Sequence, residues 1–169
     1  MPFRTRLLLI VAPLLLILDQ LSKLYIDRNF LLGESVSVFA NFFHITYIRN
    51  KGAAFGILAG SPWRVPFFVT IGVIACVALL WYLYSTRADQ KLLQISLVMV
   101  FSGALGNIID RVRLSEVIDF IDVHWYQHHW PAFNIADSAI TVGVGLMILD
   151  LWYEERRNKR AKMPTAAGE

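Results

Sequence analysis

The chain contains 169 residues, of which 56% are hydrophobic and 17% are charged, and its formal net charge at pH 7 is +3. A soluble domain of this length has too little interior to bury that much apolar surface, so the composition argues against a soluble enzyme and favours a membrane protein. The single cysteine, Cys76, lies in an apolar run, which leaves no intramolecular disulfide and no CxxC metal or redox site.

Four apolar segments are long enough to cross a lipid bilayer, which requires about 20 residues of helix. The predicted spans are residues 7–26, 65–84, 92–109 and 131–150. The first segment could instead be a cleaved signal peptide, because Arg4 and Arg6 precede its apolar run. No small-residue cleavage site follows it, so we interpret it as a retained span of a single domain that covers residues 1–169.

The two long connections between spans carry strand-like patterns. Residues 35–49 contain an alternating segment and then an aromatic, β-branched segment, and residues 116–125 have a similar composition. We therefore predict a mainly α, integral membrane fold, in which four transmembrane helices carry a small β-rich platform in the outer loops.

The distribution of basic residues predicts how the spans are oriented. Residues 1–6, 85–91 and 154–169 contain nine Lys and Arg among 29 residues, whereas the longer loops 27–64 and 110–130 contain six. Because Lys and Arg accumulate on the cytoplasmic side, we expect both termini in the cytoplasm and both long loops outside. The basic cytoplasmic tail, residues 154–169, would then bind lipid headgroups rather than nucleic acid, and we expect it to be disordered after residue 162.

Polar clusters lie toward the outer ends of the spans, where ionisable groups are costly and need a reason. Asp19 and Lys23 are four residues apart, acid first, so they can pair on one helix face. Such a pair could contribute to a site or simply hold the end of the first span. Residues 50–55 form a turn of polar and small residues, in which the backbone could approach a ligand.

A third cluster occupies residues 102–111, at the end of the third span. Its small residues allow close helix packing in a bilayer. Packing does not explain why Asn107, Asp110 and Arg111 occur together. Asn107 and Arg111 lie one helical turn apart, so their side chains should point the same way.

The fourth cluster contains two carboxylates, Asp119 and Asp137, that the predicted topology places at the outer membrane surface. Asp119 lies between bulky apolar residues in an extended segment, and Asp137 shares a helix face with Asn134. Two carboxylates held close in a partly dry site share a proton, which suits water-mediated peptide hydrolysis. The alternative, which the residues alone leave open, is a buried carboxylate paired with Lys23 or Arg111.

Other nucleophiles are less well supported. Ser22 and Lys23 suggest a Ser-Lys hydrolase, but adjacent residues of a helix do not face each other. Ser102 has no histidine in its own span.

Histidines offer a metal site as a further possibility. They occupy positions 44, 124, 128 and 129. His124 and His128 are four residues apart, but His128 and His129 follow Tyr126 and Gln127 in a polar segment, which favours a solvated loop over a zinc site. The HExxH motif of metalloproteases is absent from the sequence.

The ordered motifs resemble those of the lipoprotein signal peptidase family, also called signal peptidase II. They are DQLSK (19–23), NKGAAF (50–55), SGALGNIIDR (102–111), VIDF (117–120) and PAFNIADSAI (131–140). Together they lie in the first, third and fourth spans and in both long loops, in the order and spacing of the family. Ser102 and Ile118 stand where glycine and valine are common, and both changes are conservative in size.

The resemblance implies roles for ten residues. Asp119 and Asp137 match the catalytic aspartates, and Asn50, Asn107, Arg111 and Asn134 would bind substrate or position them. The remaining motif positions are Asp19, Lys23, Gly52 and Ala136.

The family also implies a reaction and a location. Its members cleave diacylglyceryl-modified prolipoproteins just before the lipidated lipobox cysteine, without metal, cofactor or covalent intermediate. We therefore expect a monomeric, multi-pass enzyme of the bacterial inner membrane, surrounded by membrane lipids, with its active site at the outer face. The β platform and the loop 50–65 would cradle the substrate.

Two other functional classes are alternatives to a protease. A transporter or channel would place polar residues through the whole depth of the bundle, but the cytoplasmic halves of the second and third spans are almost free of them, apart from Gln94 and Ser96. A membrane scaffold would use the small-residue helix faces, but it leaves the paired carboxylates without a role.

Overall fold

The computed structural model describes residues 1–52, 58 and 60–162. Its elements in chain order are α1 (Phe3–Asn29), β1 (Ser35–Phe39), β2 (Phe43–Asn50), α2 (Arg64–Ser85), α3 (Lys91–Leu114), β3 (Val117–Trp125), β4 (His128–His129) and α4 (Ile135–Lys162). All four helices are long and apolar enough to cross a membrane. The prediction of four helical spans with strands in the long connections is therefore confirmed.

The helix boundaries differ from the predicted spans mainly at α4. This helix begins at Ile135 rather than at residue 131 and continues to Lys162 rather than ending at residue 150. The predicted start is wrong because Phe133 is extended and pairs with Ile121 of β3, so the helix cannot begin before Asn134. The expected disorder after residue 162 lies outside the described residues.

Helix α3 is the centre of the bundle and packs against each of the other three helices. Small residues make this possible. A Cβ atom at Gly103 would overlap the carbonyl oxygen of Ala136 in α4, and one at Gly106 would overlap the carboxylate of Asp19 in α1. The close helix packing predicted from residues 102–111 is therefore present.

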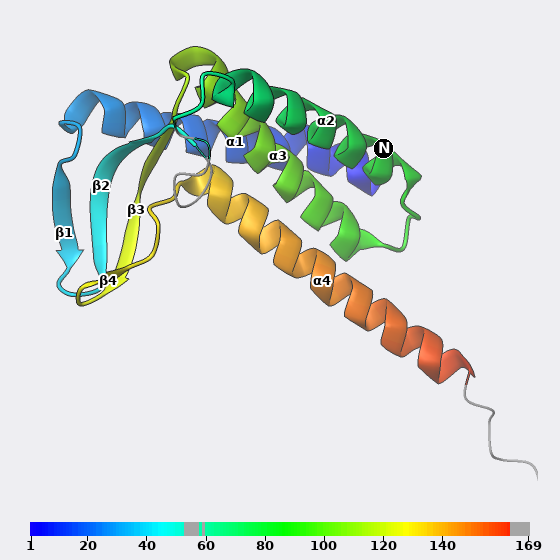
Figure 1. Ribbon diagram of the computed structural model, residues 1–169. Coiled ribbons are helices and arrows are strands. Elements are labelled where there is room, and N and C mark those ends of the chain that lie inside the picture. Colours follow the sequence, from blue (N-terminus) through cyan, green and yellow to red (C-terminus); the bar gives the residue numbers. More distant parts are fainter. Residues whose placement is uncertain (53–57, 59, 163–169) are drawn as a thin grey trace, which may run out of the picture.

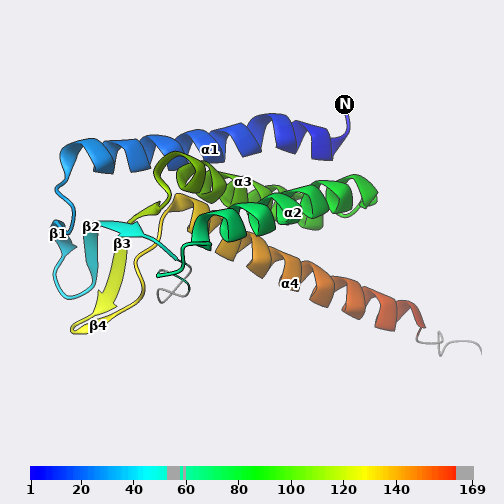
Figure 2. The ribbon, with the colours of Figure 1, turned by 45° about the horizontal axis from the view of Figure 1, so that its top comes forward.

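The strands form one antiparallel sheet in the order β1-β2-β3-β4. Figures 1 and 2 show this sheet at one end of the bundle, while the start of α1 and the end of α4 lie toward the opposite end. A cluster of buried side chains from Ile26, Tyr47, Ile118 and Phe120 joins the end of α1 to the sheet. The sheet is therefore the small platform that the sequence predicts.

The register of the sheet decides which side chains share a face. His44 of β2 lies opposite Asp122 of β3, and Ile45 lies opposite Ile121. Because side chains alternate along a strand, Asp119 and Ile121 are on one face of the sheet, and Asp122 and His124 are on the other. An irregularity between Ile45 and Ile48 adds one residue to β2 relative to β3.

The tight α3–α4 contact predicts a difference between two glycines. Gly103→Ala should lower the free energy of unfolding by about 1–3 kcal/mol, because its methyl group would overlap backbone. Gly145→Ala in α4, where a Cβ meets nothing within 4 Å, should be neutral or slightly stabilising. Thermal unfolding in detergent measures both, and equal stability of the two variants would contradict the packing described here.

Candidate active site

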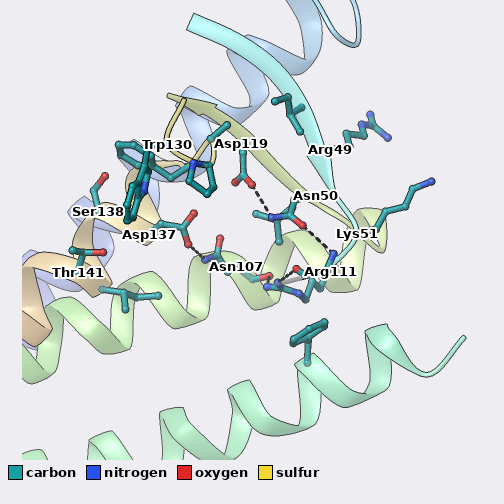
Figure 3. Close-up of a pocket in the computed structure, with 18 of the residues that line it drawn as sticks. Arg49, Asn50, Lys51, Asn107, Arg111, Asp119, Trp130, Asp137, Ser138 and Thr141 are labelled. Carbon is teal, nitrogen blue, oxygen red and sulfur yellow. Dashed lines mark hydrogen bonds between the residues drawn. The ribbon is translucent and has the colours of Figure 1, made fainter. Parts of the chain in front are cut away.

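Asp119 and Asp137 line the same cavity, although they come from different elements. The cavity has a volume of about 1090 Å³ and lies where the sheet meets the helices. Its wall is formed by β2, β3, the segment before α4, and one side of α3 and α4, with Phe68 contributed by α2. Figure 3 shows the two carboxylates close together, Asp119 projecting from β3 and Asp137 from the start of α4.

The position of Asp137 is fixed by the start of α4. The Asn134 side-chain oxygen accepts a hydrogen bond from the Asp137 amide at 2.9 Å, and the Asp137 carboxylate accepts one from the Asn134 amide at 3.3 Å. This reciprocal arrangement is a capping box, which satisfies amide groups that have no partner within the helix. Asn107 of α3 donates to the other oxygen of Asp137 at 2.7 Å.

Asp119 is buried and held by two amide side chains. Asn134 Nδ2 donates to one carboxylate oxygen at 2.7 Å, and Asn50 Nδ2 donates to the other at 3.1 Å. Burial, and to a smaller extent the neighbouring charge of Asp137, raise the pKa of Asp119 to about 7, although the two hydrogen bonds act in the opposite direction. A carboxyl group that is still protonated near neutral pH can act as an acid.

Lys23 lies in a buried charged cluster close to Asn107. Only 2% of its surface is exposed, and its ammonium group lies 2.8 Å from Asp19 and 2.9 Å from Asp110. The predicted pairing of Asp19 with Lys23 is therefore confirmed. Lys23 also donates to the Asn107 side-chain oxygen at 3.2 Å, which links the cluster to the amide that holds Asp137.

The same cluster holds the backbone near both carboxylates. Asp19 accepts from the Ala136 amide at 2.9 Å, in the first turn of α4. Asp110 accepts from the Ile118 amide at 3.3 Å, one residue before Asp119. Asp110 is not among the ten residues to which the family resemblance assigns roles. Its position three residues after Asn107, at the end of a span, is the sequence feature that could have indicated its part in the site.

Arg111 contributes the remaining side of the cavity. Its guanidinium group donates to the carbonyl oxygens of Gly52 at 3.0 Å and of Asn107 at 3.3 Å, and it lies over the Phe68 ring at 4.8 Å. The Gly52 amide in turn donates to the Asn50 side chain at 2.9 Å. Residues 53–55, the rest of this predicted motif, lie outside the described residues, as do residues 56, 57 and 59 of the loop 50–65 that was expected to cradle substrate.

Hydrogen bonds and ion pairs thus connect all ten predicted site residues. Within the described part of the chain, no ion pair reaches Asp119 or Asp137, and Lys23 pairs with Asp19 and Asp110 instead. The alternative in which Asp119 or Asp137 pairs with Lys23 or Arg111 is therefore not supported. Ser22 donates to the Asp19 carbonyl, away from the Lys23 ammonium group, so a Ser-Lys pair is not formed.

Comparison with known proteins identifies the family. A family model described as signal peptidase (SPase) II matches residues 11–153. The chain belongs to the signal peptidase II family. Since signal peptidases hydrolyse peptide bonds, the chain is a protease, and the transporter and scaffold alternatives are set aside.

Relatives and solved structures agree with this assignment over nearly the full chain. The lipoprotein signal peptidase of Syntrophotalea carbinolica is 52% identical and covers 91% of this chain and 96% of its own length. The lipoprotein signal peptidase of Geobacter metallireducens is 50% identical, and the match covers 92% of this chain and 96% of that protein. A solved bacterial membrane enzyme matches with a TM-score of 0.80 and 36% identity over 95% of this chain and 94% of that one.

Removal of the buried Lys23 ammonium group should destabilise the fold. Lys23→Met leaves Asp19 and Asp110 buried without a counter-charge, which we expect to cost about 3–5 kcal/mol. Lys159→Met is the matched control, because Lys159 also pairs with an acid four residues earlier, Glu155, but on an exposed surface. Thermal unfolding should show a large loss for Lys23→Met and little change for Lys159→Met; similar losses would contradict the role of the cluster.

Proposed function

We propose that this protein is an aspartyl endopeptidase that removes the signal peptide from diacylglyceryl-modified prolipoproteins, cutting just before the lipidated cysteine. Its relatives are named lipoprotein signal peptidases. The observation that carries the mechanism is the shared amide of Asn134, which joins Asp119 of β3 to Asp137 of α4 within one cavity.

The proposed reaction uses the two carboxyl groups as an acid and a base. A water molecule between them loses a proton to the ionised member and attacks the scissile carbonyl carbon, while the protonated member donates to the carbonyl oxygen. Collapse of the tetrahedral intermediate breaks the C–N bond: the leaving amine takes the proton that the base received from water, and a hydroxyl of the intermediate returns a proton to the other carboxylate. This chemistry needs neither a metal, a cofactor nor a covalent intermediate.

The surrounding polar residues would hold this pair rather than react. Asn50, Asn107 and Asn134 donate to the carboxylates and fix their orientation. The positive end of the α4 dipole stabilises the single negative charge that the pair carries. Arg111 braces Gly52, whose segment would lie against the substrate backbone.

The placement of the cavity suits a substrate that is part peptide and part lipid. Phe68 of α2 and Ile140 and Val142 of α4 extend the cavity wall from the dyad along the helices. We propose that the sheet end of the bundle faces the outside of the bacterial inner membrane, with both termini in the cytoplasm. Acyl chains would then lie between helices in the outer leaflet, with the cysteine at the level of the carboxylates.

Further proposals concern the surroundings of the enzyme. We expect it to act as a monomer, because one chain supplies both carboxylates and every residue that holds them. The exposed basic residues Arg156, Arg157 and Lys159 at the end of α4 would contact lipid headgroups on the cytoplasmic side.

Each dyad residue should be essential for turnover. Asp119→Asn and Asp137→Asn each remove a proton-transfer group, so kcat on a diacylglyceryl-modified precursor should fall by about 10²–10⁴-fold. Asp89→Asn, at an exposed carboxylate between α2 and α3 that does not line the cavity, is the control and should retain near wild-type turnover. Near wild-type activity in either dyad variant, with the fold intact, would disprove the dyad.

Activity and stability should both respond to pH near 7. The dyad needs one proton, and the pKa of Asp119 is raised to about 7, so kcat/KM should fall as the pH rises above 7. The unfolded carboxyl has a pKa of about 3.9, so the protonated folded form contributes stability at low pH that is lost as the pH rises toward 7.

The same linkage distinguishes Asp119→Asn from the wild type. This variant cannot lose a proton at position 119, so its melting temperature relative to the wild type should increase between pH 5 and pH 8. A constant difference across that range would show that Asp119 has an ordinary pKa.

A further inference from the structure

Three histidines that the proposed reaction does not use lie on one face of the sheet. His44 lies on β2, His124 on β3 and His129 on β4, and strand pairing brings them together around Asp122. Alternation along β3 places this cluster on the face opposite Asp119. The spacing of four residues in the sequence points to His124 and His128 as neighbours. The strand register instead places His129 opposite His124.

The three imidazole rings lie close together. Ring centres are 4.3 Å apart for His44 and His124, 4.5 Å for His124 and His129, and 6.4 Å for His44 and His129. Imidazoles bound tetrahedrally to Zn²⁺ at about 2.0–2.1 Å have ring centres roughly 5 Å apart. Two of the three separations are close to this value, and rotation of the side chains out of the stacked arrangement would be needed for all three rings to reach one ion.

The His124 ring is oriented so that its Nε2 is free to bind a metal ion. Its Nδ1 lies 2.9 Å from the Tyr126 carbonyl oxygen, which can only accept, so Nδ1 carries the hydrogen and a neutral ring has its lone pair on Nε2. His124 is 6% exposed, and its buried Nε2 has no hydrogen-bond partner among the described residues. A buried lone pair without a donor is unfavourable, and a cation would satisfy it.

His129 is oriented in the same way by a carboxylate. Its Nδ1 lies 2.9 and 3.0 Å from the two oxygens of Asp122, so Nδ1–H donates and Nε2 is left for another partner. A carboxylate that orients a ligating histidine through its second nitrogen is the usual surrounding of protein-bound zinc. His44 Nδ1 lies 3.7 Å from the same carboxylate.

We propose that His44, His124 and His129 bind a divalent transition-metal ion of the zinc type, with Asp122 as the orienting carboxylate. In this structure the His124 and His129 rings are stacked, 10° from parallel, and no three ligand side chains of the described residues yet converge on one point. The more exposed rings, His129 and His44, turn toward the fixed Nε2 of His124. A bound ion would join β2, β3 and β4 and fix the segment that continues from His129 to the cavity wall at Trp130.

The test is a titration of the full chain with ZnCl₂ in detergent by isothermal calorimetry, using protein purified without a polyhistidine tag. We expect one ion per chain, and Co²⁺ should give the visible absorption of a nitrogen-ligated, low-coordination site. His129→Asn and His44→Asn should each weaken Zn²⁺ binding by about 10-fold or more. Mg²⁺, which prefers oxygen ligands, should not compete.

His128→Asn is the matched control, because His128 is an exposed neighbour on the other face of the sheet and should not affect affinity. Melting temperatures measured in chelator show whether the variants keep the fold. The proposal is overturned if the wild type shows no saturable binding. It is also overturned if His128→Asn weakens binding as much as His129→Asn does.

Discussion

The side chain of Asn134 is the contact on which the geometry of the site depends. It is fully buried, donates to Asp119, and accepts from the backbone amide of Asp137. A buried carboxylate without hydrogen bonds is strongly unfavourable, so the amide both permits Asp119 to be buried and fixes its distance from α4. One residue thereby sets the position of a strand relative to a helix, and of two carboxylates relative to each other.

Around this contact, a balance of charge keeps the polar centre stable within an apolar bundle. Lys23 neutralises part of the charge of Asp19 and Asp110, and these two carboxylates also receive the backbone amides of Ala136 and Ile118. Apolar helices alone would pack in several similar ways. Satisfied polar contacts between α1, α3, β3 and α4 select one of them, because misalignment would leave charges buried without partners.

Local patterns made much of this predictable. Hydropathy revealed the spans because a bilayer requires a minimum helix length, and the Asp19–Lys23 pair followed from a spacing of four on one helix. Features that depend on strand register could not be predicted from the sequence. The late start of α4 depends on the pairing of Phe133 with Ile121, and the histidine cluster depends on His129 lying opposite His124. The catalytic roles proposed for Asp119 and Asp137 rest on the motif resemblance, since spacing alone also allows a simple ion pair.

The most direct test compares two precursors of identical sequence, one with diacylglycerol on the lipobox cysteine and one with a free thiol. The purified enzyme in detergent is incubated with each, and mass spectrometry identifies the cleaved bond. The account predicts rapid cleavage of the modified precursor at the bond preceding the cysteine, and very slow cleavage of the unmodified one. Equal cleavage of both, or a cut at another bond, would contradict a site built to place a lipidated cysteine beside Asp119 and Asp137.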